Sequence, residues 1–396
     1  MRRLWFWRAP VALLPMVTSG DMARVSALVQ REPSAVTVIG PGGSPSWSPS
    51  GTKLAYWTDD GLIVREMATG QHMAFGSLPP AQGHAPVWLP DESGLLVVSF
   101  GTVKTTKYTD HEVTSYQDMN LFLADLGTAK ARSLSDFADE SSVGRVSVSP
   151  DGKVAVLEGP KLGGPYMSET VKGRTNADHS ITWTEVSVPY TGLWLIRLDT
   201  AERELLMRDE NAMEFSPQVL PDGKRILFER RTRHLSPRLS DERPDTNIAL
   251  YDTANRRMRL LTRADRALDP KLAPDGRTVA FVRAIWPPDL WLIDTEDGRM
   301  GQVDGGKRAL IVSWTLNWTP DSRYVLFQSE GDICAVSRTG RGPFHLTSGL
   351  QMPELYGRGF SVHPDGKRIA YGTANGNVAV AELDWSAVPG YEPGTP

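Results

Sequence analysis

A unit repeated seven times constrains this chain more than any other feature of its sequence. In the last copy, FSVHPDGKRIAYGTANGNVAVAELD (residues 360–384), an apolar run reaches Pro-Asp-Gly, and two further runs carry apolar residues at alternate positions. Proline cannot donate to a strand ladder and glycine accepts a positive φ, so the pattern predicts hairpin turns between strands with one buried face. The prolines of the seven copies are Pro49, Pro90, Pro150, Pro221, Pro274, Pro320 and Pro364.

The spacing of these prolines predicts a β-propeller. The intervals are 41, 60, 71, 53, 46 and 44 residues, and a basic period in the low forties with three or four short strands is typical of a propeller blade. An aromatic residue stands seven positions after the proline in five copies, and Val98 and Val156 take its place in the other two. We expect this column to be buried between blades; its aromatic members are Tyr56, Phe228, Phe281, Phe327 and Tyr371.

The two ends of the repeat array predict how the ring closes. The seventh copy has no fourth strand, whereas AVTVIG (35–40) is a spare strand ahead of the first copy. Pairing the two removes two exposed sheet edges, so we expect AVTVIG to be the outermost strand of the seventh blade. The predicted fold is therefore an all-β, seven-bladed propeller closed by an N-terminal strand. A six-bladed ring with one degenerate copy is the alternative, although all seven turns are recognisable.

We expect an N-terminal extension (1–34) with one short helix, a propeller (35–385) and a C-terminal tail (386–396). The start of the chain has the arginines and apolar run of a signal peptide but no Ala-x-Ala site, so the compartment stays open between exported and cytoplasmic. No apolar run is long enough to span a membrane, and a net charge of −4 argues against nucleic-acid binding. Cys334 is the one cysteine, expected to be buried in a strand.

Two family resemblances follow from these motifs. PSWSPSGTKLAYWT, and LAPDGRTVAF with DLWLIDTEDG, resemble the TolB-like (WD40-like) propeller repeat over about residues 35–385. That family is periplasmic and binds protein partners, but this chain lacks its additional N-terminal domain. VTSGDMARVSALV (17–29) resembles, more weakly, the segment before the propeller of prolyl-oligopeptidase-type peptidases. The chain has no G-x-S-x-G elbow, so this second resemblance implies a propeller without the hydrolase.

Three neighbouring copies carry extra residues between their second and third strands, at 101–119, 158–191 and 230–246. Such connections leave a propeller on one face, and long loops in compact domains are often functional. Solvated loops that fold back onto the rim are the alternative. The expected contact residues are polar or aromatic, and they are Tyr108, His111, His179, Trp183, Arg231 and Arg233.

The chemistry-bearing patterns are weaker. Arginines 230, 231 and 233 could bind an oxyanion, but nearby carboxylates such as Glu229 favour local ion pairs. A metal site built from His111, His179 and His234 requires three loops to converge, and the histidines show no ligand spacing, so we predict neither a metal nor a cofactor.

The leading functional prediction is a non-enzymatic binding or scaffolding propeller that uses the face with the long loops. The expected partner is a protein or peptide, and we expect a monomeric ring. One alternative is a propeller that gates or escorts a separate prolyl-oligopeptidase-type hydrolase. The other is an enzyme with a pocket at the mouth of the central channel.

Overall fold

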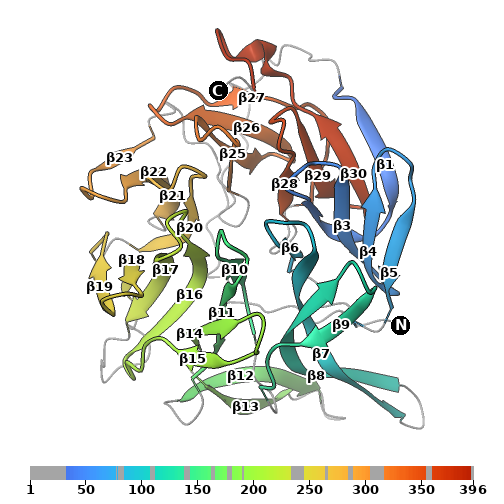
Figure 1. The fold of residues 1–396 in the computed structure, drawn as a ribbon, viewed down its shortest axis with the longest axis vertical. Helices are drawn as coiled ribbons and strands as arrows, with labels where there is room; N and C mark the ends of the chain where they lie inside the picture. The colour runs from blue at the N-terminus through green and yellow to red at the C-terminus, as the bar shows by residue number, and fades with distance from the viewer. Residues whose placement is uncertain are drawn as a thin grey trace.

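Seven four-stranded antiparallel sheets form a closed ring in the computed structural model of this protein (Figure 1), which confirms the expected all-β, seven-bladed propeller. The structure describes residues 33–76, 78, 84–107, 112–137, 143–161, 166–175, 181–189, 191–232, 245–263, 266–283, 289–303, 316–353 and 359–393. No helix among them is long and apolar enough to cross a membrane.

Blades 1 to 6 take their strands in chain order from the inside of the ring outward. Blades 1 to 3 consist of β2 (Gly43–Trp47), β3 (Lys53–Thr58), β4 (Gly61–Glu66) and β5 (His72–Phe75); β6 (Val87–Trp88), β7 (Gly94–Lys107), β8 (Glu112–Asp125) and β9 (Lys130–Ser133); and β10 (Val146–Val148), β11 (Val154–Pro160), β14 (Thr191–Arg197) and β15 (Arg203–Leu205). Blades 4 and 5 consist of β16 (Ala212–Val219), β17 (Arg225–Thr232), β18 (Asp245–Asp252) and β19 (Arg257–Leu260); and β20 (Ala267–Leu272), β21 (Thr278–Arg283), β22 (Asp289–Asp294) and β23 (Met300–Gln302).

The remaining elements complete the ring. Blade 6 consists of β24 (Asn317–Trp318), β25 (Tyr324–Ser329), β26 (Asp332–Ser337) and β27 (Phe344–His345). Blade 7 consists of β28 (Phe360–Val362), β29 (Arg368–Gly372), β30 (Asn377–Glu382) and β1 (Val36–Pro41). A separate two-stranded sheet contains β12 (Tyr166–Thr175) and β13 (Ile181–Pro189), and η2 (Trp385–Ala387) is a short 3-10 helix.

The ring closes as the spare strand predicts. β1 pairs with β30 in antiparallel register, from Val36 opposite Ala381 to Pro41 opposite Asn377, and it is the outermost strand of blade 7. Two exposed strand edges are thereby paired with each other.

The predicted column of side chains is buried. All five aromatic members, together with Val98 and Val156, are at most 6% exposed. They belong to the apolar clusters that fill the spaces between neighbouring blades. Cys334 is also buried, in β26, as expected.

The turns after the first strands show why this repeat needs glycine or a tolerant substitute. Gly51, Gly152 and Gly223 have φ between 68° and 73°. Glu92 and Ser322 adopt φ of 56° and 61° at the equivalent position of blades 2 and 6, although they are not glycines. A positive φ is thus a property of the turn itself, and glycine satisfies it at the lowest steric cost.

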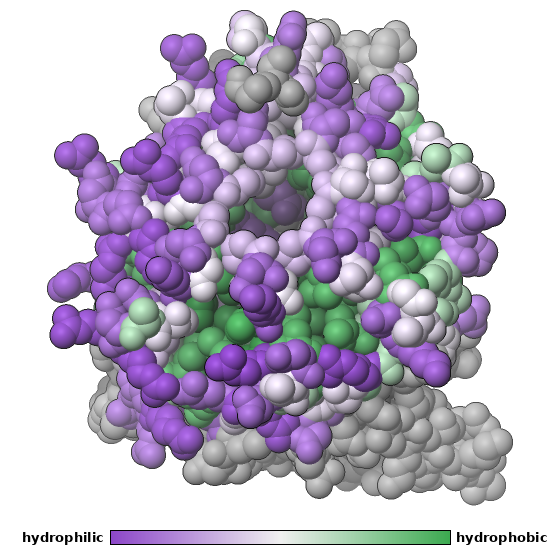
Figure 2. Space-filling model, viewed as in Figure 1, coloured by the Kyte–Doolittle hydropathy of each residue, from purple (hydrophilic) through white to green (hydrophobic). Residues whose placement is uncertain are grey.

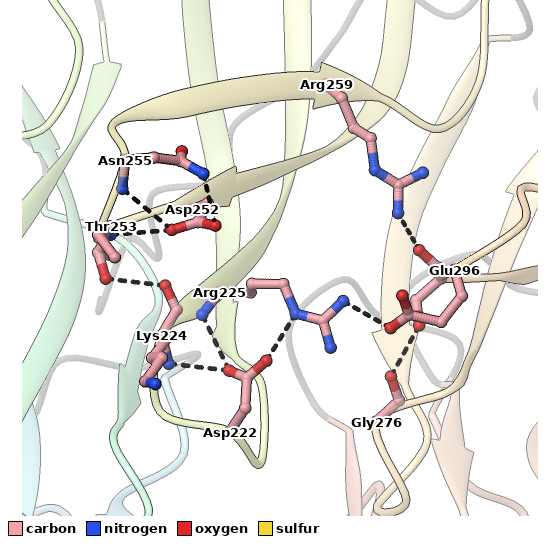
Figure 3. Close-up of polar contacts among 11 residues, drawn as sticks. Asp222, Lys224, Arg225, Asp252, Thr253, Asn255, Arg259, Gly276 and Glu296 are labelled. Atoms are coloured by element: carbon pink, nitrogen blue, oxygen red, sulfur yellow. Dashed lines mark hydrogen bonds and ion pairs between the residues drawn. The ribbon is translucent and has the colours of Figure 1, made fainter.

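These turns define two faces of the ring. We call the side with the first-to-second strand turns the turn face, and the side with the second-to-third strand connections the insertion face. Figure 3 shows how blades 4 and 5 are joined on the turn face: Asp222 accepts from Arg225 Nε at 2.6 Å, and Arg225 Nη1 reaches Glu296 of blade 5 at 2.6 Å. Arg259 donates to the carbonyl oxygen of Thr295 beside this ion pair.

A second set of contacts between blades follows the inner strands. The side chain three residues before the repeat proline bonds to the next inner strand: Ser147 Oγ accepts from Val219 N at 3.0 Å, and Gln218 Oε1 accepts from Leu272 N at 2.8 Å. Ser361 Oγ accepts from Trp47 N at 3.0 Å across the closing seam. The inner strands of these neighbouring blades are therefore joined directly to one another.

The residues after β30 pack against blades 6 and 7. Trp385 Nε1 donates to the carbonyl oxygen of Gly366 at 2.8 Å, and Tyr391 Oη donates to Asp321 at 2.8 Å. Both rings are buried and lie 4.5 Å apart between centroids. This part of the expected tail contributes to the core.

Candidate functional site

Charged and polar side chains meet between the inner strands of blades 3, 4 and 5. Arg145, Ser216 and Asp269 occupy the same repeat position, five residues before Pro150, Pro221 and Pro274. The first strand of a blade begins on the face where its second strand ends. These three residues therefore stand at the insertion-face mouth of the channel. Figure 2 shows the opening at the centre of the ring, with hydrophilic residues inside it.

Arg145 links three blades at this mouth. Its Nη1 atom donates to Ser216 Oγ of blade 4 at 2.9 Å and to Asp269 Oδ1 of blade 5 at 2.6 Å. The Asp269 side chain is fully buried, whereas about 35% of the Arg145 side chain remains exposed. The guanidinium therefore covers the carboxylate and keeps part of its own surface exposed.

The backbone is bent to make this arrangement possible. Ser216 and Asp269 have φ of 54° and 55°, and the strand register shifts between Phe215 and Gln218 and between Leu268 and Lys271. A β-bulge inserts one extra residue and re-aims side chains, and bulges are frequent next to functional sites. Here the bulges direct a hydroxyl and a carboxylate toward Arg145.

Two glutamates hold these bulges from the preceding blade. Glu158 Oε2 of β11 accepts from Ser216 N at 3.0 Å, and Glu229 Oε2 of β17 accepts from Asp269 N at 3.0 Å. Glu229 Oε1 also pairs with Arg231 Nε at 2.6 Å, and that guanidinium lies 4.3 Å above the Phe215 ring. Burial raises the pKa of Glu158, although the hydrogen bond from Ser216 and the charge of Arg145 oppose this effect.

Two more titratable groups lie close enough to Arg145 for its charge to change their pKa. Burial and the charge of Arg145 lower the pKa of Lys271, in β20, to about 8, and Asp269 partly offsets this. The same two causes lower the pKa of His84, just before β6, to about 4. At neutral pH the lysine is mostly a cation and the imidazole is neutral. We call this set the channel cluster; it consists of His84, Arg145, Glu158, Ser216, Glu229, Arg231, Asp269 and Lys271.

A second ionic network, centred on a buried carboxylate, lies between blades 3 and 4. Glu214 is 0% exposed and pairs with Lys161 Nζ at 2.7 Å and with Arg230 Nη1 at 2.8 Å. Arg230 also pairs with Asp209, and Lys161 Nζ donates to the carbonyl oxygens of Asp209 and Ala212 at 2.9 and 2.7 Å. Burial raises the pKa of Glu214 to about 7, against the opposing charges of Lys161 and Arg230.

This second network anchors the chain at the roots of two insertions. Lys161 directly follows β11, and Arg230 lies near the end of β17. Local ion pairing of Arg230 and Arg231, the interpretation favoured by the sequence, is confirmed. Glu229 is one of the expected partners, whereas Glu214 and Asp209 were not anticipated because they come from an earlier part of the chain.

The structure corrects the description of the insertions as loops. In blade 2, β7 and β8 pair continuously from Gly94 opposite Asp125 to Lys107 opposite Glu112, well beyond the ends of β6 and β9. In blade 3, β12 and β13 form their own two-stranded sheet. Both ribbons lie along the lower edge of the ring in Figure 1. Extended pairing satisfies backbone groups that a loop would leave to water, which explains the preference for ribbons.

Insertion 158–191 also begins too early in the sequence-based prediction. Glu158 pairs with Leu193, and Pro160 pairs with Thr191, so these residues belong to blade 3. The connection between β11 and β14 therefore covers residues 161–190.

The six predicted contact residues are placed as follows. Tyr108, His111, His179 and Arg233 lie outside the described residues. Trp183 is in β13, where the backbone pairs with Gly173. Arg231 belongs to the channel cluster and keeps 29% of its side chain exposed. Their common role in binding stays a prediction.

Sequence reasoning missed most of the channel cluster, although one signal was present. Aligning the copies on their prolines puts Arg145, Ser216 and Asp269 in one column, and polar residues in an inner strand are the signal to look for. In the part of the chain that is described, no group of three or more His, Cys, Asp or Glu side chains is arranged to hold a metal ion. The proposed His111, His179 and His234 set lies outside that part.

Comparison with known proteins places the chain in the β-propeller fold and no further. No family model and no curated protein matches the sequence. An oligogalacturonate lyase in complex with manganese is similar with a TM-score of 0.60 at 15% identity, over 89% of this chain and 94% of that one. An oligogalacturonate lyase from Vibrio parahaemolyticus gives a TM-score of 0.59 at 12% identity, over 88% and 93% of the two chains.

A propeller of another kind is nearly as similar. The β-propeller domain of Cps50 (Swd1) from Myceliophteria thermophila gives a TM-score of 0.55 at 13% identity, over 87% of this chain and 99% of that one. TolB from Acinetobacter baumannii gives a TM-score of 0.44 at 16% identity, over 87% of this chain and 63% of that one. An enzyme and a WD40-type domain thus share this fold, so the fold alone does not select a function.

Proposed function

We propose that this protein is a binding or scaffolding propeller that holds a protein or peptide partner on its insertion face. One observation carries the proposal: neighbouring blades 2 and 3 extend beyond the ring on this face, and blade 4 has 12 residues between β17 and β18. Blades 1 and 6 close with two residues at the same place, Asp59–Asp60 and Glu330–Gly331. A ring of this kind does not need the extensions in order to fold.

The ribbons offer a physical means of binding. Beyond Phe100, β7 pairs only with β8 among the described strands, and β12 pairs only with β13. Each ribbon therefore has outer edges whose backbone groups can receive an additional strand. An extended peptide that adds to such an edge gains main-chain hydrogen bonds, which is a recurring mode of peptide recognition.

The test replaces residues 162–190 by Asn-Gly, which keeps Lys161 in its ionic network and lets β11 and β14 meet through a short turn. We expect the far-ultraviolet circular dichroism of the four-stranded blades and the cooperative unfolding transition to persist. We also expect the variant to lose partners that the intact protein captures from its native lysate, as identified by mass spectrometry. The matched control places Asn-Gly at Glu330–Gly331 of blade 6 and should keep them.

Each result of this comparison has a definite meaning. Loss of the same proteins from both variants, or from neither, contradicts binding by the blade 3 ribbon. A captured hydrolase supports the alternative of an escorting propeller, and any other partner supports the scaffold. An unfolded variant shows that residues 162–190 are needed for folding and contradicts the proposal as stated.

An enzyme with its pocket at the channel mouth is the second candidate, because the channel cluster gathers titratable groups with shifted pKa values in one place. The similarity to two oligogalacturonate lyases supports the ability of this fold to hold an active site. The scaffold remains the leading proposal because blades 1 and 6 close with two residues where blades 2 and 3 carry long ribbons.

A further inference from the structure

The outermost strand of blade 4 combines exposed apolar side chains with positive charge. β19 alternates arginine with a large apolar residue from Arg257 to Leu260, and all four of its residues are exposed. Met258 and Leu260 are each 37% exposed, and they are two of the five large hydrophobic residues that are exposed in the described part of the chain. β19 lies on the outer edge of the ring, at the left of Figure 1, away from the ribbons along the lower edge.

The backbone of β19 has an unpaired edge. β19 ends its sheet, and among the described strands it pairs only with β18. Leu261 N donates to the carbonyl oxygen of Ile248, in β18, at 2.8 Å. Alternate residues of an antiparallel strand direct their N–H and C=O groups to opposite sides, so Arg259 also faces β18. The N–H and C=O groups of Met258 and Leu260 therefore point away from the sheet, where they can bond to an added strand.

The segment around β19 is strongly basic. Residues 253–263 contain four arginines and no aspartate or glutamate, although the whole chain has a net charge of −4. Arg256 donates to Glu204 of blade 3 at 2.7 Å, which balances one of the four charges. The two arginines within β19 share one face of the strand, and Met258 and Leu260 share the other, because successive side chains of a strand alternate.

Two carboxylates near these arginines already have other partners. Asp252 stands opposite Arg257 in the strand ladder, and its carboxylate accepts from Asn255 Nδ2 at 2.9 Å. Glu296, which lies beside the other arginine of the strand in Figure 3, pairs with Arg225 at 2.6 Å. β19 thus presents positive charge that its neighbours compensate only in part.

The pattern of charge selects the kind of partner. If β19 paired with a second copy of itself through the outward groups of Met258 and Leu260, arginines would lie opposite arginines, and like charges in that position destabilise a sheet. A segment with acidic residues opposite the arginines gains ion pairs on one face. Apolar residues at its alternate positions contact Met258 and Leu260 on the other face.

We propose that β19 is a docking strand for an extended peptide segment in which acidic and apolar residues alternate. The segment adds to the sheet of blade 4 as a new outermost strand, with its acidic side chains on the face of Arg257 and Arg259. This surface lies on the rim of the ring and is separate from the ribbons. The inference therefore does not rest on partner binding at the insertion face.

The test is fluorescence anisotropy with the full chain and a fluorescein-labelled peptide of alternating glutamate and valine. We expect saturable binding that weakens as sodium chloride is added, because salt screens exposed charges. A peptide with lysine in place of each glutamate should not bind. Equal binding of the two peptides would contradict the proposed chemistry of the partner.

The variant M258P tests addition of a strand. Proline removes the outward N–H group of this residue, and the ladder with β18 persists because Met258 directs no N–H toward β18. We expect the affinity for the glutamate peptide to fall by about tenfold, since a backbone hydrogen bond is lost and the proline ring obstructs the edge.

The matched control is M300P, in the outermost strand of blade 5. Met300 stands opposite Ile293 at the repeat position where Met258 stands opposite Tyr251, and it is 44% exposed. Its strand, β23, contains no arginine. M300P should therefore bind the glutamate peptide as tightly as the unmodified protein does.

The variant R257E changes the charge of β19 without changing its backbone. It should weaken binding of the glutamate peptide by about threefold, as expected for an exposed ion pair, and it decides the test if circular dichroism shows that M258P does not fold. The proposal is overturned if the glutamate peptide does not bind, if R257E binds it undiminished, or if M258P and M300P bind it equally. Self-association of the full chain in sedimentation that M258P abolishes would identify a second copy as the occupant and would also overturn it.

Discussion

Three tryptophans stand two residues before the repeat prolines of blades 1, 2 and 6, and they differ in one hydrogen bond. Trp47, Trp88 and Trp318 are each 6% exposed. Trp88 Nε1 donates to the carbonyl oxygen of Ser46 at 3.0 Å, and Trp318 Nε1 donates to that of Lys271 at 2.9 Å, in both cases in the preceding blade. The indole nitrogen of Trp47 is buried and has no hydrogen-bond partner.

Replacing each tryptophan by phenylalanine separates the hydrogen bond from the packing. All three variants lose a similar amount of buried ring. W88F and W318F also lose a hydrogen bond between blades, about 0.5–1.5 kcal/mol net, whereas W47F removes a buried N–H whose desolvation costs about 1–3 kcal/mol. We therefore expect W88F and W318F to lower the free energy of unfolding by about 2 kcal/mol more than W47F does.

Equilibrium unfolding in urea, followed by circular dichroism, measures this difference, provided that the m-value stays the same among the variants. A loss for W47F as large as that for W88F and W318F would refute the assignment of the hydrogen bonds.

Three further predictions concern the ring and the channel. Deleting residues 1–41 removes β1 and exposes the edge of β30, so we expect a lower melting temperature in scanning calorimetry; V38T, at an exposed position of β1, should leave it nearly unchanged. F281A should lower the free energy of unfolding by about 3–5 kcal/mol, and R277A, in the adjacent exposed turn, by less than about 0.5 kcal/mol; equal effects in urea would contradict the assigned register. K271M should be more stable than the unmodified protein at pH 7. Folding lowers the pKa of this lysine from 10.5 to about 8. Below pH 8 the lysine is charged in both the folded and the unfolded state, and its charge destabilises the folded state by the full amount. This gain should shrink as the pH rises from 8 toward 10.5, and a gain that is constant over this window would contradict the lowered pKa.

Blades 3 and 4 are connected by the channel cluster and by the buried network around Glu214. Glu214 is surrounded by Lys161 and Arg230 in the interior, where removal of one partner leaves uncompensated charge. The chain at the roots of the insertions is thus fixed by strong local interactions. A binding surface built on rigid elements is more accurately positioned than one built on loops.

The sequence by itself determined the ring. Turn residues are chosen locally, because a positive φ two residues after the proline requires glycine or a tolerant residue, and the period-two pattern fixes which face of each strand is buried. A repeat of such units can bury its apolar faces only against its own neighbours, so the number of copies sets the number of blades. The spare strand β1 closes the ring because the edge of β30 would otherwise be unpaired, and β1 pairs with it.

Only the tertiary structure decided where the charged groups meet. Arg145 and Asp269 are 124 residues apart in the chain, and their contact depends on the curvature of the ring and on the bulges that turn Ser216 and Asp269 toward Arg145. Neither is encoded in a local pattern, because a bulge changes the direction of a side chain without changing the spacing of the repeat. The burial of Glu214 follows from packing between two blades, which likewise no single repeat contains. The sequence therefore specified the scaffold, and the assembled ring created the channel cluster.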